Sequence, residues 1–339
     1  MSEIEKSVSL QVYIKKYFGV LLENDSITEV CYNGRGNIWA LHDSGEWKDY
    51  ETNLTYKATQ AISKVIASAK ETEITNNRPI LSSTLSDGER VQVVMPPACK
   101  QNHISLTIRK PSKKKISIHQ YDEQKLFLVN DNKVLLSKRS EILNSLYKEK
   151  NYKDFIVEAV KQGKNIIVAG ATGSGKTTFM KTLIEFIPNS QRIISIEDVE
   201  ELTFNEGSNF VQLFYPSEAK STDFLNSTTL LKSCLRMKPD RIVLAELRGG
   251  ETFDFINIIN SGHGGSITSC HAGSIEETFT RLEHMTLLNE NGQKIPYQVI
   301  QDTLRNTIDV IIQMADTEEG RRITEMYYKE IDYKKKDEV

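Results

Sequence analysis

The sequence predicts an α/β protein, with a mainly parallel sheet covered by helices on both faces after a smaller mixed α+β N-terminal domain. From about residue 151, apolar strands alternate with helical segments, which is typical of a parallel sheet. These strands are near-continuous runs of Ile, Val and Leu, as expected for doubly buried positions. The chain has 339 residues, 39% of them hydrophobic and 26% charged, which matches about two ordinary globular domains.

The N-terminal domain is expected over residues 1–111. Apolar residues recur at helical spacing over 4–22, and residues 56–70 form a second amphipathic helix. Short strands separated by Asn-Gly and Ser-Gly turns are expected at 27–33, 37–43, 45–50, 90–96 and 103–110.

The interdomain linker is expected over residues 112–150, a polar span with one short apolar patch at 126–129. The basic run RKPSKKK (109–115), in which five of seven residues are cationic, overlaps the start of this span. A solvated linker face is the favoured interpretation of this run. Contact with an anionic lipid surface is the alternative, because clustered lysines gain roughly 1 kcal/mol each near such a surface.

The C-terminal domain is expected over residues 151–339, with the pattern of a doubly covered sheet. Strands are expected at 165–170, 192–198, 241–247 and 266–272. Helices are expected at 152–162, 176–187, 222–237 and 251–261.

A phosphate-binding loop stands between the first of these strands and its helix. The string GATGSGKT (170–177) satisfies G-x-x-x-x-G-K-[ST], whose glycines let the backbone wrap around phosphate at a helix N-terminus. Lys176 is expected to reach the β- and γ-phosphates, and Thr177 to offer its hydroxyl to Mg²⁺. The expected nucleotide-binding residues are Gly170, Ala171, Thr172, Gly173, Ser174, Gly175, Lys176, Thr177 and Thr178.

Hydrolysis also needs an acidic group that orients water, and Glu246 is the candidate, directly after the apolar run RIVLA. Ala245 stands where many P-loop ATPases have a metal-holding Asp, so part of the metal binding moves elsewhere. The run IEDVEE (196–201) can supply it through Glu197, Asp198 and Glu201 at the C-terminal edge of the sheet. The alternative is that this run is only an acidic helix start.

Two histidines lie in the block SGHGGSITSCHAGS (261–274). A metal site from His263, Cys270 and His271 is conceivable, but neighbouring strand residues point to opposite faces and too few ligands are nearby. His271 is expected to contact the γ-phosphate side of the nucleotide. A structural histidine is the equal alternative.

The remaining composition restricts the class of protein. No run approaches the roughly 18 apolar residues of a membrane span, and residues 1–25 carry charges throughout, so a cytosolic protein is expected. Four cysteines without a CxxC pair predict packed, reduced thiols rather than disulfides or a structural zinc site. The net charge of −3 argues against a globally basic nucleic-acid binder.

Four blocks in order, GATGSGKT, IEDVEE, LRMKPDRIVLAELRGGE and SGHGGSITSCHAGS, resemble the secretion ATPase superfamily. The branch that they resemble is the hexameric traffic ATPases of type IV secretion and conjugation systems (TrbB- and TrwD-like). The segments SITEVCYN, GNIWAL, DGERVQVVMPP and SLTIRKPSK carry the likeness into the N-terminal half. The resemblance covers most of residues 25–315 apart from 116–150, and it implies a RecA-like ATPase domain.

The resemblance also implies site roles. Glu246 would activate water, Glu197 and Glu201 would act around Mg²⁺, and His271 would lie near the γ-phosphate. Arg90 and Arg109 of the N-terminal domain would approach the phosphates and couple hydrolysis to domain motion. Arg248 is a further candidate on weaker grounds.

The expected function is therefore an oligomeric ATPase that uses ATP and Mg²⁺ to power substrate translocation or pilus assembly in type IV secretion or conjugation. A homohexameric ring on inner-membrane partners is expected, cytoplasmic and peripheral to that membrane, without sequence-specific nucleic-acid binding. One alternative is a type II secretion or type IV pilus motor. However, the chain lacks the paired-CxxC element common in extension motors and reads HAGS (271–274) where retraction motors usually read HTNSA. A RecA-like nucleic-acid translocase is the weaker alternative, because no basic or aromatic stripe lies outside 109–115.

Overall fold

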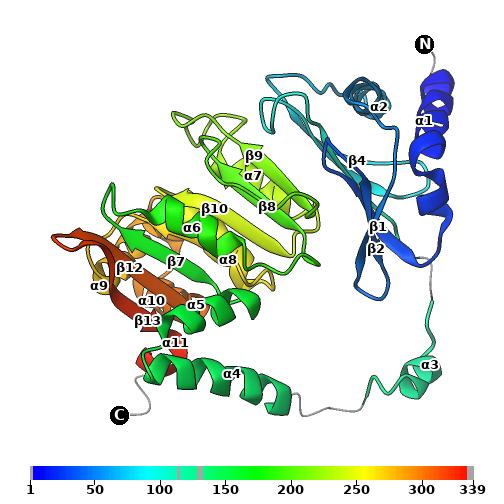
Figure 1. The fold of residues 1–339 in the computed structure, drawn as a ribbon. Helices are drawn as coiled ribbons and strands as arrows, with labels where there is room; N and C mark the ends of the chain where they lie inside the picture. Colours follow the sequence, from blue (N-terminus) through cyan, green and yellow to red (C-terminus); the bar gives the residue numbers. More distant parts are fainter. Residues whose placement is uncertain (1–2, 113–114, 128–132, 334–339) are drawn as a thin grey trace.

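The fold contains two sheets, each with its own helices (Figure 1). It is a computed structural model that describes residues 3–112, 115–127 and 133–333. The first sheet belongs to the N-terminal domain and the second to the C-terminal domain, so the predicted α/β architecture with a preceding α+β domain is confirmed.

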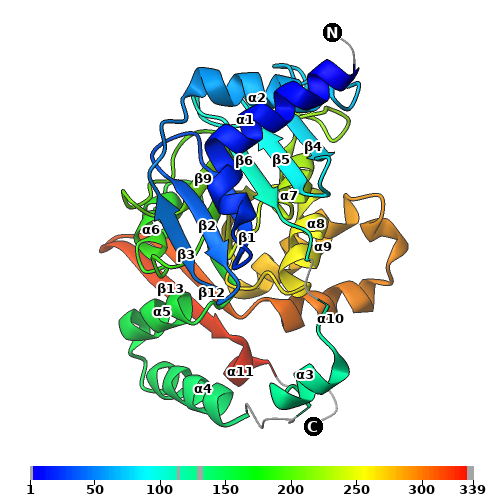
Figure 2. The same ribbon diagram turned by 90° about the vertical axis from the view of Figure 1, so that its right-hand side faces the viewer.

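The N-terminal domain is a six-stranded antiparallel sheet in the order β3-β2-β1-β6-β5-β4. Helices α1 and α2 pack against each other and lie over one face of the sheet (Figure 2). Apolar side chains of both helices, among them Phe18 and Ile62, join the sheet in one core. The elements are α1 (Glu3–Glu23), β1 (Ile27–Tyr32), β2 (Ile38–His42), β3 (Trp47–Tyr50), α2 (Tyr56–Ser68), β4 (Ile80–Thr84), β5 (Arg90–Val94) and β6 (Ser105–Arg109).

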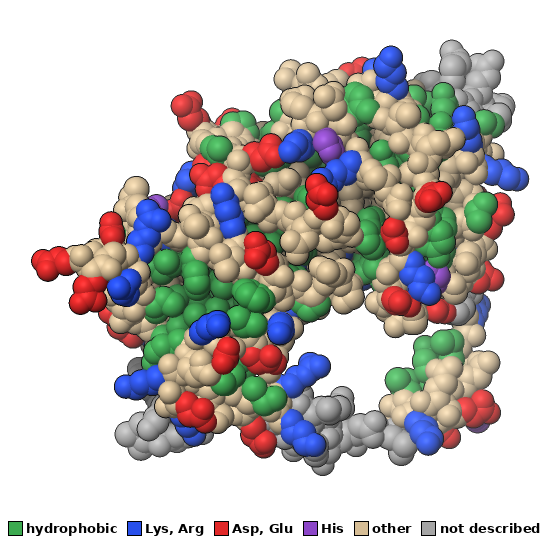
Figure 3. Space-filling model, in the orientation of Figure 1, with side chains coloured by type: hydrophobic (Ala, Val, Ile, Leu, Met, Phe, Trp, Pro, Cys, Tyr) green, Lys and Arg blue, Asp and Glu red, His purple; other side chains and the backbone are tan. Residues whose placement is uncertain are grey.

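The segment expected as a linker contains two helices, α3 (Ile118–Glu123) and α4 (Lys133–Lys148). In the C-terminal part of α4, Leu143 is fully buried against helix α5 (Tyr152–Lys161), so α4 adds to the surface of the C-terminal domain. Helix α3 instead stands apart from that domain (Figure 3). Its Ile118 is exposed. Two lysines of the basic run 109–115, at positions 113 and 114, and residues 128–129 of the apolar patch lie outside the described residues.

The C-terminal sheet has seven strands in the order β13-β12-β7-β11-β10-β8-β9. All neighbouring pairs are parallel except β12–β13, an antiparallel hairpin at one edge. The strands are β7 (Ile166–Gly170), β8 (Ile193–Glu197), β9 (Phe210–Phe214), β10 (Arg241–Leu247), β11 (Ile267–Cys270), β12 (Val310–Thr317) and β13 (Gly320–Tyr328).

Helices cover both faces of this sheet. Successive residues of a strand point to opposite faces, so each strand contributes apolar side chains to both layers of helices. Ile166 and Val168 of β7 pack with α5 and α6, whereas Ile167 and Ala169 pack on the side of α7 to α10. The helices are α6 (Lys176–Ile184), α7 (Ser227–Cys234), α8 (Glu251–Asn260), α9 (Ile275–Leu287), α10 (Tyr297–Thr307) and α11 (Lys329–Asp332), with a 3₁₀ turn at Gly292–Lys294.

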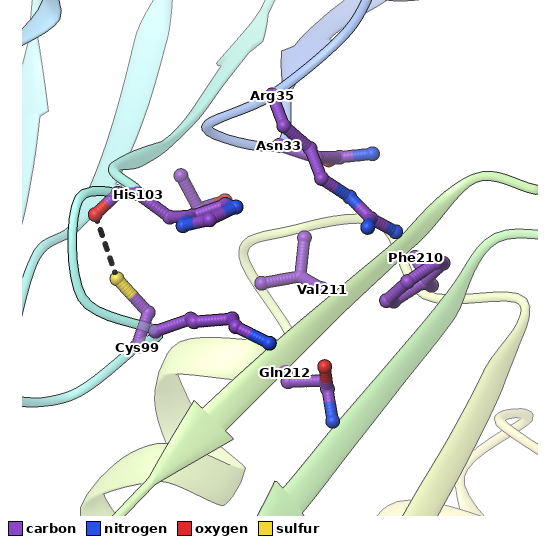
Figure 4. A pocket seen from close by; sticks show the side chains of 9 residues that line it. Asn33, Arg35, Cys99, His103, Phe210, Val211 and Gln212 are labelled. Atoms are coloured by element: carbon purple, nitrogen blue, oxygen red, sulfur yellow. Dashed lines mark hydrogen bonds between the residues drawn. The ribbon is translucent and has the colours of Figure 1, made fainter. Parts of the chain in front are cut away.

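The N-terminal domain sits against β9, the edge strand of the C-terminal sheet. Phe214 N donates to Ala98 O at 2.9 Å, and Cys99 forms an isolated bridge with Leu213. Figure 4 shows the small cavity beside this contact, where Arg35 lies 4.1 Å from the centre of the Phe210 ring. Its volume of about 20 Å³ holds about one water molecule, so it is a packing gap rather than a ligand site.

A buried arginine strengthens the domain contact. Arg192, at the start of β8, is fully buried, and its Nη1 donates to Asn33 Oδ1 of the N-terminal domain at 2.8 Å. Trp47 Nε1 donates to Asp240 Oδ2 at 2.9 Å, close to the same residues. Because an unpaired buried guanidinium is costly, these bonds make the docked arrangement specific.

All four cysteines are buried and unbridged, as predicted. No helix within the described ranges is long and apolar enough to cross a bilayer.

Candidate functional site

The phosphate-binding loop lies between β7 and α6 and is shaped by glycine. A Cβ on Gly170 would lie 2.5 Å from both Met314 O and Ser174 Oγ, so no larger residue fits. Gly175 has a φ of +92° and is the N-terminal cap residue of α6. The free N–H groups at the start of α6 therefore face the loop, as anion binding requires.

Lys176 is the first residue of α6 and is 8% exposed. Its Nζ donates to Gly170 O and Ala171 O, each at 2.8 Å, and lies 3.3 Å from His271 Nδ1. Burial lowers the pKa of Lys176, and the charge of Glu246 offsets part of this effect. The ammonium of Lys176 is thus held at the loop, near Glu246, the carboxylate expected to orient the attacking water.

The other predicted groups follow along the C-terminal edge in strand order β7, β11, β10, β8. His271 follows β11, Glu246 stands near the end of β10, and Asp198 follows β8. Neighbouring strands are about 4.8 Å apart, so these side chains meet although they are distant in sequence. This edge is where open α/β sheets bind ligands.

Contacts join these groups into one chain of polar side chains. His271 Nε2 lies 2.9 Å from Glu246 Oε1, and Arg248 Nε donates to Glu246 Oε2 at 2.7 Å. The other arm of Arg248 pairs with Asp198. Burial disfavours the charge on Arg248, but hydrogen bonds and charges from Glu246 and Asp198 outweigh it and raise its pKa above the ordinary value. Arg248, which the sequence suggested only weakly, is the residue that fixes Glu246.

Glu197 has a different environment from its neighbours in IEDVEE. It is fully buried, and burial raises its pKa. Oε1 accepts from Ser195 Oγ and Gln212 Nε2, and Oε2 accepts from the backbone N–H groups of Glu201 and Leu202. Since a carboxylate offers about four lone-pair sites, these bonds leave Glu197 no free position for Mg²⁺. Its contacts are those of a residue that holds the loop after β8.

The groups that remain for Mg²⁺ are Thr177, Asp198 and Glu246, near the loop and along the adjoining edge. Glu201 is exposed, and the metal role expected for it stays a prediction. No cluster of three His, Cys, Asp or Glu side chains suited to a metal occurs in the described ranges. Mg²⁺ in phosphate-transfer sites keeps several waters and uses one or two carboxylates plus phosphate oxygens, so the residues present fit that ion.

Arg90 and Arg109 lie elsewhere on the chain. They stand directly opposite each other on β5 and β6 and line a cavity of about 1180 Å³ beneath α1. Lys238, which precedes β10, lines the same cavity, whereas Glu246 stands at the other end of that strand, roughly 20 Å away. The structure therefore does not bring the two arginines to the phosphate-binding loop of their own chain.

His263 and Cys270 do not join the site as metal ligands. Cys270 is fully buried in the core, and burial raises its pKa to about 11, which makes it a packed thiol. His263 lies in the turn before β11, where Ser266 Oγ donates to its carbonyl at 3.2 Å.

Comparison with known proteins gives one consistent family. The model of the type II/IV secretion system protein family matches residues 58–325. The chain is 46% identical over 314 residues to the type IV secretion system protein VirB11 of Brucella abortus, covering 91% of this chain and 86% of that protein. It is 37% identical over 315 residues to PtlH of Bordetella pertussis, covering 91% and 92%. The crystal structure of the VirB11 ATPase of Brucella suis, in complex with sulphate, superposes with a TM-score of 0.88 at 42% identity and 96% coverage of both chains.

Proposed function

The chain belongs to the type II/IV secretion system protein family, and on this premise we propose that it is the ATPase that powers a type IV secretion system. The observation that carries the proposal is the chain of contacts from Lys176 through His271, Glu246 and Arg248 to Asp198, beside the phosphate-binding loop. It places a phosphate-binding lysine close to a carboxylate that can orient the attacking water and accept its proton.

In the proposed reaction, water attacks the γ-phosphorus of ATP and ADP leaves. Lys176 moves from the loop carbonyls to the β- and γ-phosphate oxygens and neutralises charge there. Glu246 orients the water and accepts its proton, while Arg248 keeps the carboxylate in place. His271 lies between the two groups, with Nδ1 3.3 Å from Lys176 Nζ and Nε2 2.9 Å from Glu246 Oε1, and would relay the state of the phosphate to the carboxylate.

Thr177, with Asp198 or Glu246, would hold Mg²⁺, which when bound neutralises charge on the phosphate oxygens. Glu197 instead fixes the backbone that carries Asp198, through its bonds to the two N–H groups after the loop.

The position of the two arginines supports a ring of subunits, and we expect a hexamer. Arg90 and Arg109 stand opposite each other across the β5–β6 pairing, with Glu29 of β1 in register beside Arg109. We infer that the nucleotide phosphates of a neighbouring subunit are a further anion that these two arginines bind. Hydrolysis in one subunit would then release the N-terminal domain of the next.

The ring would work at the cytoplasmic face of the inner membrane on membrane-embedded components of the secretion system. A pull-down with the intact protein identifies those partners.

The defining experiment measures ATP turnover by wild type and by Lys176→Ala in the presence of Mg²⁺. Wild type should hydrolyse ATP, and Lys176→Ala should lose turnover with its thermal unfolding midpoint nearly unchanged. Lys181→Ala, at the other end of α6, is the matched control and should retain turnover. Equal turnover in wild type and Lys176→Ala would overturn the proposal. Sedimentation with Mg²⁺ and a non-hydrolysable ATP analogue tests the ring, and a one-chain mass would contradict it.

A further inference from the structure

We propose that Arg321, on the β12–β13 hairpin, binds the diphosphate of the nucleotide from the side of the loop opposite His271. Strand β12 lies next to β7, with Met314 in register with Gly170, where the phosphate-binding loop begins. The hairpin continues past that point and returns, so its tip projects beyond the sheet beside the loop (Figure 1). Arg321 is the second residue of β13, just after the turn at Gly320.

The side chain of Arg321 lies against the loop itself. Its Cδ is 3.0 Å, its Nε 3.5 Å and its Nη1 3.6 Å from the position that a Cβ on Gly175 would occupy. Gly175 directly precedes Lys176, whose N–H begins α6. The guanidinium thus stands at the helix N-terminus that receives phosphate.

This placement is unfavourable unless an anion is bound. A helix N-terminus carries partial positive charge, and Lys176, the residue after the contact at Gly175, adds a full charge. Arg321 is exposed and, among the described residues, its guanidinium makes no hydrogen bond or ion pair. Its cross-strand neighbour Asp316 forms no ion pair with it within that part of the chain. A phosphate group would relieve this repulsion and satisfy the arginine in a bidentate contact.

The neighbouring arginine is a natural control. Arg322 points to the opposite face of the hairpin because side chains alternate along a strand. It lies 4.0 Å from Glu319 within the same turn, away from the loop. No sequence feature near residues 320–322 marked either arginine, because nothing local reveals that the hairpin returns beside the loop.

This inference rests on the proposed nucleotide site, and the experiment separates the two. Titration of the full chain with fluorescent ADP compares wild type, Lys176→Ala, Arg321→Ala, Arg321→Lys and Arg322→Ala. We expect Arg321→Ala to weaken ADP binding about tenfold, or about 1.4 kcal/mol, Arg321→Lys to recover part of the loss, and Arg322→Ala to bind as wild type. Raising the salt concentration should narrow the difference between wild type and Arg321→Ala.

The outcomes are distinct. Failure of wild type to bind ADP would overturn the nucleotide site as a whole. ADP binding that Lys176→Ala weakens but Arg321→Ala leaves at the wild-type value would overturn only the role of Arg321. Equal losses in Arg321→Ala and Arg322→Ala would also overturn it, because they would reflect a general effect on the hairpin. Thermal unfolding of each variant establishes that the protein titrated is folded.

Discussion

Replacing Glu246 with glutamine tests the proposed chemistry most directly, because the substitution keeps the shape and removes the charge. The amide oxygen can still accept from Arg248 Nε, now at 2.7 Å from Oε2, and the amide nitrogen takes the place of Oε1 beside His271 Nε2. Arg248 is half exposed, so the lost ion pair contributes less than about 1 kcal/mol to stability. The unfolding midpoint should fall by no more than about 4 °C.

Turnover should respond far more strongly. Positioned general bases contribute about 10²–10⁴ in rate, so Glu246→Gln should hydrolyse ATP at least 100-fold more slowly, a barrier increase of about 2.7 kcal/mol. ATP affinity should stay within about threefold, because Lys176 and the loop remain. Phosphate release gives the rate and fluorescent ATP gives the affinity, with Glu276→Gln, on the exposed surface of α9, as the matched control. Wild-type turnover by Glu246→Gln would refute the assignment.

Three further predictions follow from burial and backbone geometry. Glu197→Ala removes the acceptor of four hydrogen bonds in a fully buried site and should lower the free energy of unfolding by about 2–4 kcal/mol in urea titrations. Gly175→Ala places a Cβ at a φ of +92° and 3.0 Å from Arg321 Cδ, so ADP affinity, measured by titration, should fall at least tenfold. Burial raises the pKa of Glu29 from 4.5 to about 7, although Arg109 opposes this. The folded state therefore keeps a proton that the unfolded chain releases, and stability should decline by about 3 kcal/mol as pH rises from 4.5 to 7. Glu29→Gln should remove that part of the pH dependence in urea titrations at pH 5, 6, 7 and 8.

Each of these has a contrary outcome. Unchanged stability in Glu197→Ala, with an altered Mg²⁺ requirement, would return that residue to the metal site. Full ADP affinity in Gly175→Ala would mean that the loop tolerates a side chain. A Glu29→Gln variant whose stability follows the wild-type pH profile would place the titration at another group.

The central strands could be predicted because burial on both faces requires a continuous run of apolar residues in the sequence. The expected strand 241–247 coincides with β10, and the expected helix 152–162 is one residue longer than α5. Strands β9 and β13 and the hairpin that β13 closes were missed. β13 lies at an edge with mostly exposed side chains, so its sequence carries no continuous apolar run. Helix α4 was missed because its sequence is mostly polar and only part of it, around Leu143, is buried.

The residues of the candidate site likewise divide into those that a local motif predicts and those that only the fold brings together. The phosphate-binding loop is a local structure, so its residues could be assigned from one string. Arg248 bridges Glu246 and Asp198 only because β10 and β8 are neighbours, which is a property of strand order. Equally, nothing in the sequence states which end of the C-terminal sheet the N-terminal domain meets. The positions of Arg90 and Arg109 relative to the loop therefore could not be derived before the fold.

The packing of the N-terminal domain against β9 affects how a fragment without that domain would behave. Residues 98 and 99 supply backbone partners to the end of a strand that would otherwise be an open sheet edge. A fragment that begins at residue 151 would keep every residue of the phosphate-binding loop and still expose that edge, together with the buried guanidinium of Arg192. Such edges add strands from other chains, so the isolated ATPase half would tend to self-associate through β9. The N-terminal domain thus covers the β9 edge and keeps the C-terminal domain from self-associating through it.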